Sequence, residues 1–253
     1  MKKPSNKKSA PRKSPPLETQ FQQALEQAKL DAMKELAYGA SHEINNPLAN
    51  ISTRAQTLLK LETDPEKRRM LAAIHAQAMR AHEMIADLML FARPPALNRA
   101  RFDLGSLLEK LMVEMTPQAV EQRTELTLSK STAPIEIDAD ATQLAVSIRA
   151  VIQNSLEALG TEGRVEVSAT LSGSTVTITV TDTGPGISPE ILPHIFEPFY
   201  SGREAGRGLG FGLSKCWRIV TDHGGTVEVS SQCPHGANFR LILPSLASGQ
   251  KAH

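Results

Sequence analysis

An apolar stripe with helical spacing runs through residues 17–62 and limits the fold more than any other feature. Leucine, isoleucine and alanine recur every three or four residues along it, from Leu25 through Ile44 to Leu58. A helix of this length would extend roughly 65–70 Å at 1.5 Å per residue. Because such a helix cannot bury its stripe against itself, it needs a partner helix and often a second chain.

A second helical stripe follows a break at residues 64–66 (Asp-Pro-Glu), a pattern typical of a helix start. Its apolar positions run from Met70 to Phe91, and the helix should end before the two prolines that follow. Two antiparallel helices joined by a short connection form a hairpin, and two hairpins form a four-helix bundle. We therefore predict an all-α, dimerising hairpin over residues 17–92 and a linker over residues 93–101.

The pattern changes after the linker, and the distribution of glycine marks the change. One of the 16 glycines lies in residues 1–104 and the rest follow. A glycine-poor helical part and a turn-rich second part are therefore expected. We predict an α+β sandwich over residues 102–245. Its predicted helices are 104–116, 140–159 and 209–223, and its predicted strands are 124–129, 134–138, 164–171, 175–182, 226–231 and 237–243, with a hairpin turn at 172–174.

Charge and composition exclude several classes of protein. Residues 1–13 carry six of the 28 basic residues and no acid, which leaves 22 basic against 27 acidic residues elsewhere. A mildly acidic body argues against nucleic-acid binding. No apolar run approaches the roughly 18 residues that span a bilayer, so we expect no membrane insertion. Residues 1–16 are predicted to be a disordered basic tail, with contact to an acidic surface as the alternative, and residues 246–253 a C-terminal tail.

The two cysteines, Cys216 and Cys233, match no metal-ligand spacing. Free thiols are typical of a reducing compartment, which predicts a cytoplasmic protein.

His42 stands in the segment SHEINNPLANI (41–51), beside the apolar stripe of the first helix rather than on it. An exposed imidazole near neutral pKa is a competent nucleophile toward phosphorus. The adjacent carboxylate of Glu43 can hold one ring nitrogen protonated while the other attacks. Asn46, one helical turn later, lies on the same face and can orient a water. His75 and His82, on the second helix, are interpreted as ordinary surface residues.

Two further segments carry polar side chains suited to a nucleotide. Asn154, in AVIQNSLEALG, is a hard oxygen ligand on an amphipathic helix and can hold Mg²⁺ beside ATP phosphates. Asp182 ends a strand pattern and opens DTGPGIS, where Gly184 and Gly186 allow a sharp turn. A carboxylate there can accept a hydrogen bond from an exocyclic amine such as that of adenine, although a plain Asp-Gly turn is the equal alternative.

A run of alternating glycines opens the last predicted helix, in the segment GRGLGFGLS (206–214). Backbone amides at such a helix start can approach an anion, and the helix dipole favours negative charge. The segment lacks the Lys-Ser/Thr ending of a P-loop, and no strand directly precedes it. The aromatic segment around Phe196 can pin a mobile loop to the core. The glycines of the run are Gly206, Gly208, Gly210 and Gly212.

Taken together and in order, these motifs resemble those of bacterial two-component sensor histidine kinases over residues 30–245. SHEINNP resembles the H-box, VIQNSLEA the N-box and DTGPGI the G1 box. IFEPFYS resembles the F-box, and GRGLGFGLS the G2 box. The resemblance implies a dimerising phosphoacceptor hairpin followed by an ATP-binding domain of the Bergerat fold, shared with Hsp90, DNA gyrase and MutL.

The resemblance also implies a role for each matching residue. His42 would be the phosphorylated nucleophile, Glu43 its activating carboxylate, and Asn46 an aid to phosphatase activity on the response regulator. Asn154 would coordinate Mg²⁺, and Asp182 would bind the adenine amine. Gly184 and Gly186 would shape the adenine pocket, and Gly206, Gly208, Gly210 and Gly212 would form the phosphate lid. Phe196 of the F-box would be a further cofactor-binding residue. The implied partners are a second copy of the chain and a separate response regulator.

Ala150 departs from the family pattern, which usually has a second asparagine one helical turn before Asn154. Its absence motivates an alternative function, a dimeric scaffold with little kinase activity. A chaperone- or topoisomerase-like ATPase is the other alternative, but those relatives carry a water-activating Glu there, and Ala150 cannot replace it. The sequence shows no sensor domain, so we expect the signal to come from a separate sensory partner or the chain to be a fragment.

Overall fold

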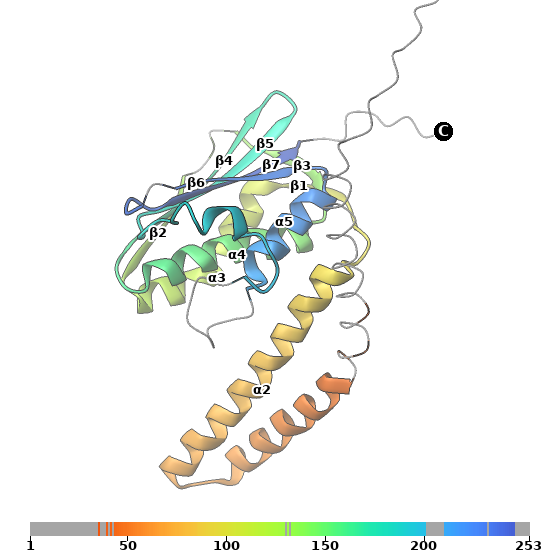
Figure 1. Cartoon of the computed structure of the whole chain (residues 1–253), viewed down its shortest axis with the longest axis vertical. Coiled ribbons are helices and arrows are strands. Elements are labelled where there is room, and N and C mark those ends of the chain that lie inside the picture. The colour runs from red at the N-terminus through yellow and green to blue at the C-terminus, as the bar shows by residue number, and fades with distance from the viewer. Residues whose placement is uncertain are drawn as a thin grey trace, which may run out of the picture.

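This computed structural model describes residues 35, 39, 41, 43–129, 131, 133–200, 210–231 and 233–245. A helical hairpin is followed by a domain in which helices pack on a mixed β-sheet, as predicted (Figure 1). Among these residues, no helix combines the length and the apolar character that crossing a bilayer requires.

The hairpin is described from residue 43 onward. Residues 43–61 are helical, and the second helix, α2, spans Pro65–Ala92. Asp64 caps α2, because its carboxylate accepts hydrogen bonds from the backbone N–H groups of Glu66 and Lys67. Arg68 then donates to two carbonyls at the end of the preceding helix, each at 2.8 Å. The predicted second helix is confirmed, and residues 17–34 of the predicted first helix lie outside the described residues.

Two histidines of α2 join it to the preceding helix. His82 donates from Nδ1 to the side-chain carbonyl of Asn45 at 2.9 Å, and His75 shares a 2.9 Å hydrogen bond with Ser52. Both histidines are cross-helix partners; His82 is exposed, as the interpretation as a surface residue implies, whereas His75 is half-buried. The hydrogen bonds fix the antiparallel register of the hairpin.

A five-stranded sheet forms one layer of the following domain. Its strands are β2 (Thr124–Ser129), β4 (Gly163–Ser172), β5 (Thr175–Asp182), β6 (Thr226–Ser231) and β7 (Ala237–Pro244). Their order is β2-β4-β5-β7-β6, and only the β2–β4 pair is parallel. Ser172 pairs with Thr175, so Gly173 and Ser174 form the tight turn that the sequence predicted.

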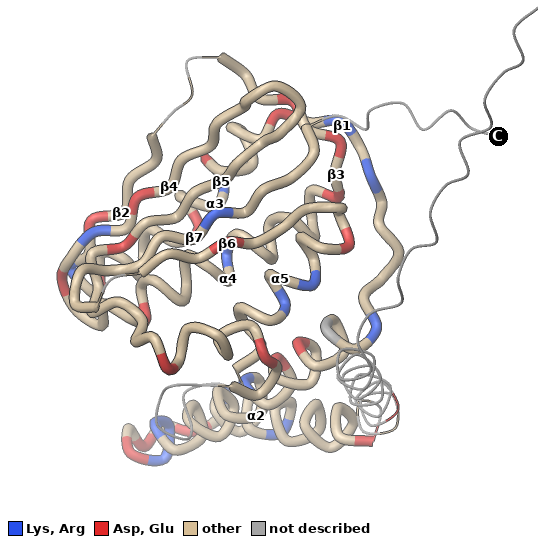
Figure 2. The backbone as a smooth tube through the Cα atoms, turned by 45° about the horizontal axis from the view of Figure 1, so that its top comes forward, with Lys and Arg blue, Asp and Glu red and all other residues tan. Residues whose placement is uncertain are grey.

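Three helices form the second layer, beneath one face of the sheet (Figure 2). They are α3 (Leu104–Glu121), α4 (Ala141–Leu159) and α5 (Gly212–Asp222). Asp103 and Asp140 cap α3 and α4 through their carboxylates. The core lies between the layers, where Leu144, Ile148 and Phe239 are fully buried. This continuous core makes the domain a rigid support for the loops at the ends of α4 and β5.

Several boundaries differ from the sequence predictions by a few residues, and two of these differences have an identifiable cause. A short strand, β1 (Ala100–Asp103), pairs with β3 (Glu136–Ala139), so the predicted linker over 93–101 is shorter than expected. Helix α3 also continues through Pro117 to Glu121. Proline removes one N–H from the helix, and the carbonyl left unbonded belongs to exposed Val113, where water can satisfy it.

Within the described residues, both the hairpin and the connecting segment contact the sheet domain. Lys215 of α5 forms an ion pair with Asp87 of α2, and Figure 1 shows α5 beside the C-terminal part of α2. In the connecting segment, the N–H of Asn98 donates to Asp140 at 2.9 Å, and Gln143 donates to the carbonyl of Pro95 at 3.1 Å. The connection is therefore attached to the start of α4.

Candidate functional site

The candidate site lies where the C-terminal end of β5 meets the C-terminal half of α4. Asp182 is the last residue of β5, and the residue is only 4% exposed. Oδ1 accepts hydrogen bonds from the N–H of Gly184 at 2.9 Å and of Ala237 at 3.2 Å. Oδ2 accepts one from the hydroxyl of Ser155 at 3.0 Å. The sheet, the following turn and α4 thus converge on one acidic side chain.

This carboxylate retains room for one more donor. An ionised carboxyl group offers about four acceptor positions, and the hydrogen bonds among the described residues occupy three of them. The remaining position is on Oδ2. Asp182 therefore fits a ligand that points one N–H toward Oδ2, as the exocyclic amine of adenine can.

The glycines after Asp182 allow the chain to turn tightly around it. A Cβ on Gly184 would lie 2.9 Å from Asp182 Oδ1, closer than real side chains approach, so a larger residue would displace the carboxylate. Gly186 follows in the same turn, and the next amide, of Ile187, donates to Ser231 at 2.8 Å. The predicted turn is thus built around the carboxylate rather than merely following it.

Asn154 lies on α4 directly before Ser155 and is half-buried. Ala150, one turn earlier, packs against the core. In the described part of the chain, no group of three or more histidine, cysteine or acidic side chains could form a metal cage. The side-chain oxygen of Asn154 is a hard donor of the kind that Mg²⁺ accepts together with phosphate oxygens.

The aromatic segment before the glycine run is anchored to the sheet domain. Phe196 packs against the core, and the ring of Phe199 meets that of Phe211 edge-on at 4.7 Å. Gly210 has φ +72°, and a Cβ there would collide with the carbonyl of Tyr200. Tyr200 and Gly210 therefore lie in close contact.

The structure describes only part of the glycine run. Gly206 and Gly208 lie outside the described residues, whereas Gly210 precedes α5 and Gly212 begins it. Helix α5 starts without an acidic residue in its first turn and without a side-chain cap bond in the part of the chain described. Its N-terminal amides and dipole suit an anionic group.

The predicted phosphoacceptor segment lies on the first helix of the hairpin. His42 itself lies outside the described residues. Glu43 and Asn46 are helical and exposed to solvent. Their side chains are therefore accessible from solvent.

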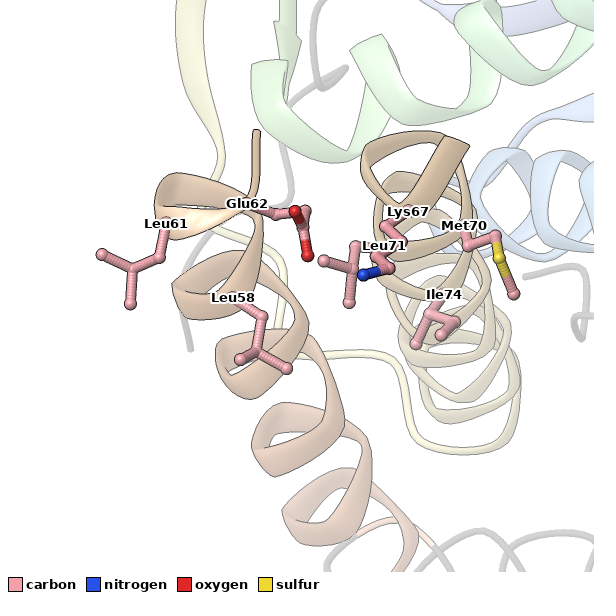
Figure 3. A pocket seen from close by; sticks show the side chains of 7 residues that line it. All are labelled: Leu58, Leu61, Glu62, Lys67, Met70, Leu71 and Ile74. Atoms are coloured by element: carbon pink, nitrogen blue, oxygen red, sulfur yellow. The ribbon is translucent and has the colours of Figure 1, made fainter. Parts of the chain in front are cut away.

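An apolar face remains open along the same hairpin. Near its turn, Leu58 and Leu61 on one helix and Met70, Leu71 and Ile74 on the other line a hollow of about 360 Å³ (Figure 3). Leu61 is 77% exposed and Met70 61% exposed. Exposed apolar surface of this extent is typical of a helix face that packs against another chain.

Ser155 is the site residue that the sequence analysis did not single out. In the N-box segment only Asn154 stands out by residue type, yet Ser155, the next residue, faces inward on α4 and is fully buried. A serine on the buried face of an amphipathic helix needs a hydrogen-bond partner, and this requirement is the signal that points to it.

Two family models match the chain. The model "His Kinase A (phospho-acceptor) domain" matches residues 32–96. The model "Histidine kinase-, DNA gyrase B-, and HSP90-like ATPase" matches residues 139–247. The matches fall on the hairpin and on the domain that contains Asp182.

Relatives and solved structures agree with these matches. The chain is 33% identical over 217 residues to sensor histidine kinase ZraS of Escherichia coli (strain K12), covering 85% of this chain and 46% of that protein. Full-length ShkA in complex with AMPPNP is similar with a TM-score of 0.74 and 28% identity, over 83% of this chain and 45% of ShkA. Histidine kinase ThkA, in complex with response regulator protein TrrA, shares the fold with a TM-score of 0.64 and 22% identity, over 90% and 66% of the two chains. This chain therefore spans about half the length of such curated relatives.

Proposed function

The chain belongs to the family of two-component sensor histidine kinases, and from this premise we propose that it is an ATP-dependent kinase that phosphorylates its own His42. The observation that carries the proposal is the buried carboxylate of Asp182, with one open acceptor position beside a glycine turn. This site suits an adenine amine and lies on a domain of the matching ATPase family.

In the proposed reaction, a ring nitrogen of His42 attacks the γ-phosphorus of ATP. The bond between that phosphorus and the bridging oxygen breaks, ADP leaves, and the ring proton passes to solvent or to Glu43. Asn154 would hold Mg²⁺, which neutralises phosphate charge when bound. The protein contributes chiefly by positioning, because phosphoryl transfer needs little other covalent chemistry from it.

The phosphoryl group then passes to an aspartate of a separate response regulator. The phosphorus–nitrogen bond of phosphohistidine breaks, and an acyl phosphate forms on the regulator. Asn46, exposed near the phosphoacceptor, would orient a water in a phosphatase reaction on the same regulator. The complex of ThkA with TrrA supports a partner of this type.

We propose that two chains form a homodimer through the open apolar face of the hairpin. The hairpin would comprise residues 17–92. The ATP-binding domain would begin at Ala100, where β1 starts, and extend to residue 245. A separate sensory protein would set the rate of autophosphorylation. A cytoplasmic location accords with the two free cysteines, of which Cys216 is buried with its pKa raised to about 12 by burial.

The test is incubation of the purified chain with γ-labelled ATP and Mg²⁺. We expect label that is lost in acid and kept in alkali, and that is absent from His42→Ala. His82→Ala is the matched control, since it removes another histidine of the same hairpin and should keep the label. Acid-stable label, or label that persists in His42→Ala, would contradict the proposal. Steady phosphate release without a labelled protein would indicate an ATPase instead.

A further inference from the structure

Ser155 and Asp182 form a hydrogen-bonded pair in the interior of the sheet domain. The hydroxyl of Ser155 donates to Asp182 Oδ2 at 3.0 Å, and the two residues are 0% and 4% exposed. We propose that Ser155 is a positioning residue that fixes the rotation of the Asp182 carboxylate and so makes the site selective for a base with an exocyclic amine. The proposal rests on the proposed function and extends it to nucleotide specificity.

Backbone hydrogen bonds alone do not fix this carboxylate. The amides of Gly184 and Ala237 both donate to Oδ1, so they hold one oxygen and leave the other free to move. The terminal torsion of an aspartate side chain has a broad energy profile, because it joins an sp³ to an sp² carbon. Ser155 supplies the second point of attachment, on Oδ2, and the carboxylate plane is then determined.

The same hydrogen bond decides how many donors the site accepts. With Ser155 in place, Oδ2 offers one position, which matches one N–H of a ligand. A base with a carbonyl oxygen at the equivalent position would place two acceptors together in a buried site, and the unpaired oxygens would weaken binding. Without Ser155, a second position on Oδ2 is open to water, and the geometry for the amine is lost.

A second serine of α4 provides a matched comparison. Ser147 is also fully buried, but its hydroxyl donates to the carbonyl of Leu144 in its own helix at 2.9 Å. The two serines share residue type, helix and burial and differ in the partner of the hydroxyl. Substitution of Ser147 therefore measures the structural cost of removing a buried serine hydroxyl from α4.

The experiment is nucleotide titration of the full chain by calorimetry with Mg²⁺, comparing ATP with purine riboside triphosphate, which lacks the amine. Wild type should bind ATP about tenfold or more tightly than the analogue, since the amine makes a hydrogen bond to a charged group. Ser155→Ala should lose about tenfold in ATP affinity but less than about twofold for the analogue. Ser147→Ala should change the preference for ATP over the analogue by less than about twofold.

Two results for Ser155→Ala would contradict the proposal. Equal weakening of both ligands by Ser155→Ala would mean that Ser155 has only a structural role, and unchanged affinities would mean that it has none at the site. Ser155→Cys, which keeps the volume and weakens the donor, should give the same selective loss at smaller size if the alanine variant unfolds. A wild-type chain that binds neither nucleotide would overturn the proposed function itself, and with it this assignment.

Discussion

The hairpin and the sheet domain bury their apolar residues in different ways. In residues 41–92, the side chains that the structure describes as buried are those of Ser41, Ala55, Ala78 and Ala92, while larger apolar side chains stay partly exposed. In the sheet domain, strands and helices enclose large side chains such as Phe239 and Leu144 completely. The sheet domain therefore has a complete core, whereas the hairpin requires a second surface to complete its own.

This difference in packing affects the candidate nucleotide site and the hairpin in different ways. Among the described residues, the carboxylate of Asp182 accepts hydrogen bonds from Ser155 of α4, from Ala237 of β7 and from Gly184 in the turn after β5, so the core supports it on two sides. Glu43 and Asn46 instead lie on a helix whose apolar face is exposed in the single chain. We infer that nucleotide binding is a property of one chain and that phosphoacceptor geometry depends on the dimer.

The largest effect should come from removing a core side chain of the sheet domain. Phe239→Ala should lower the free energy of unfolding by about 3–5 kcal/mol, because the cavity cannot collapse between sheet and helices. Leu61→Ala, at an exposed position of the hairpin, should change it by less than about 0.5 kcal/mol. Urea unfolding followed by fluorescence of the single tryptophan, Trp217 on α5, measures the sheet domain selectively. Equal shifts in the two variants would contradict the comparison.

The next effect concerns the apolar face of the hairpin. Leu58→Glu combined with Ile74→Glu should raise the dimer dissociation constant at least about 100-fold, because charged groups would be buried between the chains. Sedimentation equilibrium measures the change, and the Trp217 unfolding transition should stay unaltered. Val113→Glu is the control, since Val113 is 76% exposed on α3, outside the hairpin. A dimer that survives the double substitution would show that another surface joins the chains.

How well the sequence predicted the structure also differs between the two regions. Alternation of apolar residues located five of the seven strands closely, since β2, β5 and β6 have their predicted bounds and β4 and β7 differ by a residue or two. Strand β1 was missed because four residues are too few for a periodic pattern to be recognised. The sequence predicted that helix α3 ends before Pro117, whereas it continues to Glu121. Helix propensity penalises an internal proline but does not take into account that water can bind the carbonyl that the proline leaves unbonded.

The candidate site was predicted in its residues but not in its connections. Asp182 and its glycines stood out because their types and spacing are local properties of the chain. Their partners, Ser155 and Ala237, are 27 and 55 positions away in the sequence, and only the packing of α4 and β7 around β5 brings them there. The ion pair of Lys215 with Asp87 was equally invisible, since it joins residues 128 positions apart.

A smaller effect should come from a helix cap and should depend on pH. Burial alone raises the pKa of Asp140, but hydrogen bonds from the N–H groups of Gln143, Asn98 and Thr142 outweigh it and lower the pKa below its ordinary value. Asp140→Ala should therefore cost about 1–2 kcal/mol at pH 7. Since the pKa is lower in the folded state, this contribution exists above about pH 4 and is lost as the pH falls through the folded-state pKa.

Urea unfolding at pH 7 and pH 3, followed by Trp217, measures this dependence. The difference between wild type and Asp140→Ala should narrow at the lower pH. Asp64→Ala removes the equivalent cap of α2 in the hairpin and should leave the Trp217 transition unchanged at both values. A pH-independent difference would mean that the cap acts through packing rather than through its charge.

The smallest effect should come from the ion pair that joins the two regions. Lys215 is 13% and Asp87 38% exposed, so the pair is only partly shielded from water and should contribute about 0.5–1 kcal/mol. Lys215→Ala should let the domains separate more often and raise tryptic cleavage after Arg99 about two- to fivefold. Arg218→Ala is the control, because its partner Asp222 lies on the same helix and the change leaves α2 untouched. Equal cleavage rates in wild type, Lys215→Ala and Arg218→Ala would mean that the hydrogen bond of Asn98 to Asp140, and not this ion pair, holds the domains together.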